Sequence, residues 1–194
     1  MVSNGYLVVG DGTSSDVRSL NQNLPNSSRP NNVLAPFWTD LNPAAAGGVR
    51  IAYLTDDVDT WIVIDWEGVK EYRTANTASF QIWIGIDGDT HSGEDISYAY
   101  GTIQGNGDLG LLTVGAENKF GNRGGNYYYN GAGSLPANGT QLRVTGTPGV
   151  PSGTHVLSFS AKGILVGDWT NYATMTSDQF QGTSIAPMSG KVLP

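Results

Sequence analysis

Residues 61–66 read W-I-V-I-D-W, and residues 80–86 read F-Q-I-W-I-G-I. Successive side chains of a strand point to opposite faces, so the apolar positions 80, 82, 84 and 86 share one face. Gln81 and Trp83 lie on the other. In the first stretch both faces are apolar, which indicates a central strand that is covered on both sides. The two stretches therefore predict neighbouring β-strands.

The same pattern recurs along the chain, in runs bounded by Gly, Asn, Asp or Pro. These further predicted strands are residues 49–54, 96–103, 109–116, 126–130, 140–145 and 155–161. Turns at 106–108 and 137–139 carry Asn and Gly, which accept positive φ at low cost. No amphipathic helix stands out. We expect an all-β fold, an antiparallel β-sandwich of jelly-roll type with little or no helix, as one domain over residues 1–194.

The composition excludes several classes of function. The 194 residues include no Cys, which excludes disulfides, cysteine-ligated zinc and thiol catalysis. The formal net charge is −7 and Lys and Arg form no run, so we expect no nucleic-acid partner. No apolar stretch approaches the roughly 20 residues of a membrane span, so we expect no membrane partner.

The first residues, M-V-S-N-G, lack the charged and apolar regions of a signal peptide. Either an export signal has been removed or the chain is a fragment that begins with an expression Met. We favour a fragment excised from a larger exported protein.

Three short motifs resemble those of a subtilisin-like catalytic triad, around Asp11, His155 and Ser184. The position of the catalytic base in the motif H-G-T-H-V is Ser152 here, which cannot act as the base. The serine motif is one residue short, and Pro187 opposes the helix that should follow the nucleophile. We therefore expect no catalytic residues in this chain.

An acidic loop at residues 87–95 places oxygen ligands between two predicted strands. Asp87 and Asp89, with Glu94 or Asp95 folding back, form the ligand set that Ca²⁺ prefers. The alternative is a solvated acidic turn. A second acidic turn at residues 56–59 is more simply the tip of a β-hairpin.

Aromatic residues provide the candidate ligand-binding surface. Trp83 lies opposite the apolar face of its strand, and alternation places Tyr128 on one face with Tyr127 and Tyr129 on the other. We predict Tyr127, Tyr129 and Trp83 as contacts for sugar or peptide. A glycosidase pair at residues 65 and 67 is a weaker interpretation, because carboxylates two apart on a strand form a charge pair on one face.

Residues 31–43 read N-N-V-L-A-P-F-W-T-D-L-N-P, which resembles the A-P-F-W-x-D hallmark of nidogen-like extracellular domains. The segments that follow keep the order of that family: residues 61–69, 79–84, 96–101 and 112–118. The resemblance covers about residues 5–145 and implies an extracellular β-sandwich.

A fuller resemblance includes residues 20–25 and 175–187. It is similar to an accessory region of secreted bacterial subtilisin-like serine proteases. This implies a secreted parent enzyme whose triad lies outside the chain. The chain would then attach substrate, an insoluble protein or polysaccharide, or support the catalytic domain as its partner. Two alternatives stay open: a free-standing extracellular adhesion or carbohydrate-binding module, and a hydrolase, which would need a deep pocket.

Some residues have expected structural roles. Leu20, Leu24 and Val33 should anchor the Pro-rich segment at residues 13–32, and residues 37–38 should bury large aromatic area. Glu117 should need a donor such as Arg123.

Overall fold

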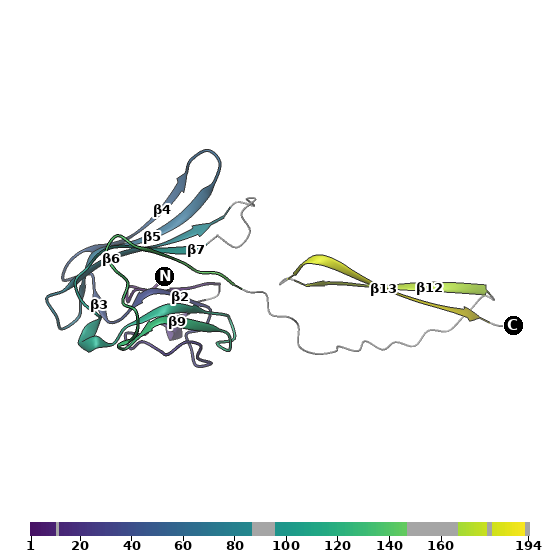
Figure 1. Cartoon of the computed structure of the whole chain (residues 1–194), viewed down its shortest axis with the longest axis horizontal. Helices are drawn as coiled ribbons and strands as arrows, with labels where there is room; N and C mark the ends of the chain where they lie inside the picture. Colours follow the sequence, from purple (N-terminus) through teal and green to yellow (C-terminus); the bar gives the residue numbers. More distant parts are fainter. Residues whose placement is uncertain (11, 87–95, 147–166, 178–179, 193–194) are drawn as a thin grey trace. The chain divides into compact units, whose positions relative to one another are not determined.

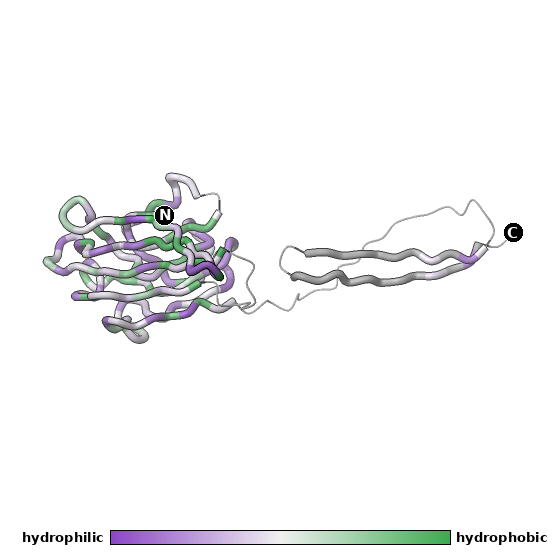
Figure 2. Tube along the Cα trace, turned by 90° about the horizontal axis from the view of Figure 1, so that it is seen from above, coloured by the Kyte–Doolittle hydropathy of each residue, from purple (hydrophilic) through white to green (hydrophobic). Residues whose placement is uncertain are grey.

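The computed structural model describes residues 1–10, 12–86, 96–146, 167–177 and 180–192. The chain divides into two compact units, Met1–Thr145 and Gly146–Pro194. The sandwich lies in the first unit, and a single domain over residues 1–194 stays a prediction. Hydrophilic and hydrophobic residues alternate along the strands of the first unit (Figure 2).

One layer of the sandwich is a five-stranded sheet in which all neighbours are antiparallel. In spatial order its strands are β1 (Leu7–Val8), β2 (Val33–Trp38), β8 (Thr113–Glu117), β9 (Gly124–Tyr129) and β10 (Ala132–Gly133). β2 is a strand that the sequence pattern does not predict.

The other layer is a six-stranded antiparallel sheet, drawn above β2 and β9 in Figure 1. Its order is β11 (Gln141–Arg143), β7 (Ile96–Ile103), β6 (Thr77–Gly85), β5 (Thr60–Glu71) and β3 (Leu41–Asn42), with β4 (Gly48–Thr55) also paired to β5. The helical elements in the described residues are two 3-10 turns, η1 (Ser14–Asp16) and η2 (Asp108–Gly110). The predicted all-β antiparallel sandwich is confirmed.

The core between the sheets takes side chains from both layers. Its buried members are Leu34, Phe37, Leu41, Ile64, Trp66, Val69, Ala78, Phe80, Ile82, Tyr98, Tyr100, Leu112, Val114 and Tyr128. Trp66 stacks on Phe80 with ring centroids 5.0 Å apart. The hydroxyl of Tyr98 donates to the carbonyl of Gly115 at 2.9 Å, and that of Tyr100 to Pro36 at 2.9 Å. Because these two bonds cross between the sheets, they join the layers at defined points.

A second apolar cluster covers the outer face of the five-stranded sheet. It contains Val2, Tyr6, Leu24, Val33, Ala35 and Trp38. The rings of Tyr6 and Trp38 lie 4.3 Å apart, and the Tyr6 hydroxyl donates to the carbonyl of Asp16 at 2.6 Å. Leu24 and Val33 are buried as predicted, but Leu20 is 66% exposed, so its predicted role as an anchor is wrong.

An ion pair holds this covering segment in place. The buried carboxylate of Asp16 accepts from the guanidinium of Arg29 at 2.6 and 2.8 Å, and from the backbone N–H of Thr13 at 2.7 Å. The hydrogen bond from Arg29 lowers the pKa of Asp16 below its ordinary value. Residues before β2 are therefore held to one another by polar contacts, in addition to the apolar contacts of the cluster.

The second unit contains a two-stranded antiparallel sheet of β12 (Gly167–Ser177) and β13 (Phe180–Val192). The hydroxyls of Thr170 and Ser189 lie 2.9 Å apart across the pair. Lys191 and Asp168 form an exposed ion pair at 3.9 Å.

Candidate functional site

The outer face of the six-stranded sheet carries two tryptophans from adjacent strands. The register places Val63 of β5 opposite Trp83 of β6, and Trp61 opposite Gly85. The indole rings of Trp61 and Trp83 lie 6.1 Å apart in an edge-to-face arrangement. Val63, between Trp83 and Ala52 in the paired strands, is only 3% exposed. We call Trp61, Val63 and Trp83 the tryptophan face.

A chain of polar side chains borders the tryptophan face. The Trp83 indole N–H donates to Gln81 Oε1 at 2.9 Å, and Gln81 Nε2 donates to Asp65 Oδ1 at 3.1 Å. Arg50 of β4 lies 3.8 Å from the Asp65 carboxylate and also pairs with Glu67. These bonds fix the orientation of the Trp83 ring, because its only polar atom is engaged. Half-buried rings beside amide, carboxylate and guanidinium groups can pack against an apolar ligand surface and hydrogen-bond to its polar groups.

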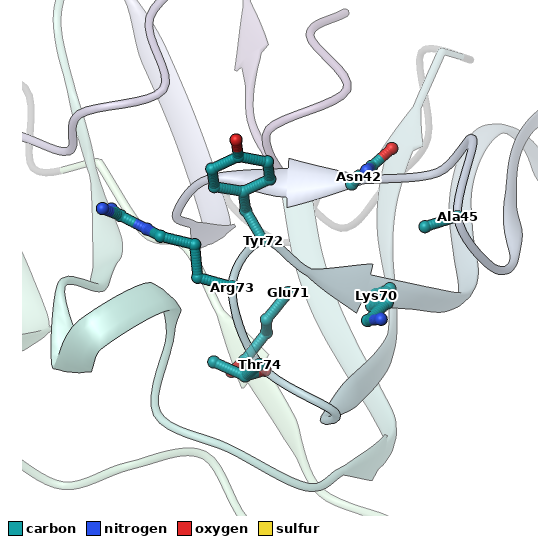
Figure 3. A pocket seen from close by; sticks show the side chains of 7 residues that line it. All are labelled: Asn42, Ala45, Lys70, Glu71, Tyr72, Arg73 and Thr74. Carbon is teal, nitrogen blue, oxygen red and sulfur yellow. The ribbon is translucent and has the colours of Figure 1, made fainter.

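A second candidate is a shallow hollow of about 360 Å³ at the end of β5. It is lined by Asn42, Ala45, Lys70, Glu71, Tyr72, Arg73 and Thr74 (Figure 3). Glu71 is fully buried and accepts from the backbone N–H of Gly107 at 3.0 Å, and from Thr74 and Asn76 at 3.3 and 3.4 Å. Its carboxylate therefore holds the turn that precedes η2.

Arg73 extends away from Lys70 in this hollow (Figure 3) and binds the buried carboxylate of Asp108 at 2.5 and 3.1 Å. Burial and the nearby charge of Asp108 raise the pKa of Asp40 above its ordinary value, and Arg73 acts in the opposite direction. Of the charged residues of the hollow, Glu71 is thus engaged with Gly107, Thr74 and Asn76, and Arg73 with Asp108. We assign them to the stability of the loops and not to ligand binding.

The structure does not bring the three predicted ligand-binding aromatics together. Trp83 lies in β6 of the six-stranded sheet, whereas Tyr127 and Tyr129 lie in β9 of the five-stranded sheet. Tyr128 is buried in the core. The register pairs Val114 with Tyr128 and Gly115 with Asn126, so Tyr127 occupies a bulge and is 46% exposed. One ligand could not contact all three predicted residues on one surface.

The predicted calcium ligands Asp87, Asp89, Glu94 and Asp95 lie outside the described residues. Within the described part of the chain, no group of three or more His, Cys, Asp or Glu side chains is arranged to hold a metal ion. The acidic turn at residues 56–59 is a hairpin tip, as predicted: the Asp56 carboxylate accepts from the backbone N–H groups of Val58 and Asp59 at 3.1 and 2.8 Å. The calcium site at residues 87–95 therefore remains a prediction from the sequence.

Asp11 and His155 of the triad-like motifs also lie outside the described residues, and Ser184 lies in β13. The predicted partner of Glu117 is wrong. Its Oε2 accepts from the backbone N–H of Asn26 at 2.7 Å, not from Arg123. Burial raises the pKa of Glu117 above its ordinary value, and the bond from Asn26 opposes that shift.

The sequence pattern does not predict the contact of Trp61 with Trp83 or the contribution of Arg50 to the border of the face. Alternation along each strand placed Trp61 with Val63, and Gln81 with Trp83. It contains no information on which strands are neighbours, so the pairing of β5 with β6 and β4 was needed to define the site.

No helix in the described residues is long and apolar enough to cross a membrane. The family model described as NIDO related matches residues 1–161 of the chain. The match spans the first unit and continues into the second. No curated protein and no solved structure matches the chain.

Proposed function

This chain belongs to the NIDO-related (nidogen-related) family, and from that premise we propose that it is a non-catalytic extracellular binding module. The observation that carries the proposal is the tryptophan face with its polar border. Trp61 and Trp83 stand on a rigid sheet, and Trp83 is held by Gln81. Aromatic side chains on rigid elements bind ligands with little loss of conformational entropy.

We place this module in a secreted subtilisin-like serine protease, on the resemblance of residues 20–25 and 175–187. There it attaches the enzyme to an insoluble protein substrate, or supports the catalytic domain. Binding to the substrate keeps the catalytic domain close to it, which raises the effective concentration of cleavable bonds without any new contact to that domain. The charge pairing of Asp65 and Glu67 with Arg50 supports a binding role over proton transfer.

The alternative is a free-standing adhesion or carbohydrate-binding module. It is favoured by the proximity of the indole rings to the Gln81 amide and the Asp65 carboxylate, because sugars present apolar ring faces beside hydroxyl groups. Both functions use the same face and differ in the ligand.

The test is retention of the purified full chain on insoluble collagen, casein and polysaccharides. Substitutions Trp61→Ala and Trp83→Ala are each expected to weaken retention on the matching matrix about tenfold or more, as for aromatic anchors of other interfaces. Tyr127→Ala is the matched control, since this exposed aromatic lies in the other sheet. It should leave retention unchanged.

Retention on protein matrices supports substrate attachment, and retention on polysaccharide supports the adhesion alternative. Equal retention by all three variants would overturn the tryptophan face as the binding surface. No retention on any matrix would overturn substrate attachment to those polymers and would leave support of the catalytic domain as the function to examine.

A further inference from the structure

β4 presents a long free edge. It pairs with β5 in a continuous register from Gly48 opposite Glu67 to Thr55 opposite Thr60, without a bulge. In the part of the chain that the structure describes, no strand pairs with the other side of β4. Alternate backbone N–H and C=O groups along that side therefore point outward without a strand partner. Figure 1 shows β4 at the margin of its sheet.

This edge lacks the features that usually prevent pairing. Edge strands are commonly protected by Pro, by bulges, by short length or by several charges. β4 is eight residues long, contains no Pro, and has Arg50 as its single charged residue. An unprotected edge of this length is a template for a further strand.

Most of the exposed side chains of β4 are apolar. Ile51 and Tyr53 are 62% and 67% exposed, although they lie opposite Ile64 and Ile62 and so share the face of the sheet that builds the core. Large apolar side chains gathered on an open edge indicate an interaction surface.

We propose that β4 pairs antiparallel with β4 of a second copy of this chain, centred on Ile51, so that the two six-stranded sheets become continuous. The sequence of β4 is self-complementary in this register. On the core-side face, Ile51 meets Ile51 of the second copy and Val49 meets Tyr53. On the outer face, Arg50 meets Ala52 instead of another charge. Aromatic and β-branched cross-strand pairs stabilise a sheet, and like charges directly opposite destabilise it.

Charge also selects the antiparallel direction. The hairpin tip next to β4 carries Asp56, Asp57 and Asp59. A parallel pair would place both acidic tips side by side. The antiparallel pair places them at opposite ends, which separates like charges by the length of the strand. A peptide segment of another protein could also use this edge, but the self-complementary sequence favours a second copy.

The first experiment measures the molar mass of the full chain by sedimentation equilibrium over a range of concentrations. We expect a monomer–dimer equilibrium that approaches twice the chain mass of 20.5 kDa. Ile51→Lys places two ammonium groups at the centre of the pair, and should raise the dimer dissociation constant at least about tenfold. Val58→Lys, at a tip residue that is 81% exposed and outside the paired stretch, is the matched control and should leave the constant unchanged.

The second experiment tests the register, and the absence of Cys in the chain makes it specific. In Ile51→Cys the two sulfurs would meet across the symmetry axis, where opposite Cα atoms lie about 4.5–5.5 Å apart, within reach of a disulfide. Mild oxidation should therefore convert this variant into a covalent dimer. Val58→Cys, more exposed but far from its counterpart in the second copy, should cross-link much more slowly.

Three results would overturn the proposal. The first is a monomer at all concentrations. The second is a dimer that Ile51→Lys leaves intact. The third is equal cross-linking of the two cysteine variants, which would mean random collision. Circular dichroism of each variant shows whether it keeps the fold. Capture of an extended peptide by a monomeric chain, lost in Ile51→Lys, would overturn self-pairing and assign the edge to another protein.

Discussion

The outer faces of the two sheets differ in how far other segments of the chain cover them. Residues before β2 cover the five-stranded sheet, where Tyr6 packs on Trp38 and the buried Asp16 binds Arg29. Trp61 and Trp83 of the six-stranded sheet are left half-buried. We infer that the covered face contributes stability and that the tryptophan face, half-buried among the described residues, is available for binding.

The strongest test of this difference between the faces removes one tryptophan from each and compares the loss of stability. Trp38→Ala should lower the free energy of unfolding by about 3–5 kcal/mol, because it leaves a cavity under the covering segment. Trp83→Ala should cost about 1 kcal/mol or less, since its side chain already meets solvent. Denaturant unfolding of both variants measures the difference. Equal costs would contradict the division of roles.

The acidic loop at residues 87–95 lies between β6 and β7 in the sequence. Adding Ca²⁺ tests whether a ligand at this loop stabilises the six-stranded sheet. Ca²⁺ bound only to the folded chain should add about 2.7 kcal/mol at a hundredfold excess over its dissociation constant. A thermal melt with Ca²⁺ and with chelator measures the shift. The double variant Asp87→Asn and Asp89→Asn should abolish it. If the melts coincide for the unmodified chain, the loop is an acidic turn.

The ion pair under the covering segment should make the covered face sensitive to acid. Because Arg29 lowers the pKa of Asp16, the stability from the pair is fully present above the ordinary carboxyl pKa of 3.8 and is lost as pH falls through the lowered value. Arg29→Met should lower the melting temperature by a few degrees at pH 7, and this difference should shrink below about pH 4. A difference that is constant with pH would exclude the ion pair as its cause.

Removing the charge of Glu117 should have the smallest effect on stability, and it should stabilise the fold, whereas loss of the Asp16–Arg29 pair should destabilise it. Its pKa is raised by burial, so the cost of holding its charge is full above that raised pKa and disappears as pH falls through it. Glu117→Gln keeps an oxygen for the N–H of Asn26 and removes the charge. The variant should be slightly more stable at neutral pH, with no advantage in acid. A loss of stability at neutral pH would show that the charged form is preferred.

Much of the fold followed from the local pattern. The strand predicted at residues 96–103 coincides with β7, and Phe80 and Ile82, which alternation places on one face of their strand, are both buried in the core. Period-two patterning is a property of neighbouring residues, so a single segment contains enough information to place its side chains on one face or the other.

The residue pattern alone predicted the fold class, the side chains that share a face in each predicted strand, and the family resemblance carried by residues 31–43. Tertiary structure decided which strands are neighbours. That pairing joined Trp61 to Trp83, left the edge of β4 free, and gave Glu117 a partner 91 residues away at Asn26. The physical reason is range: alternation is local, whereas strand order and long-range hydrogen bonds arise from the packing of distant segments around one core.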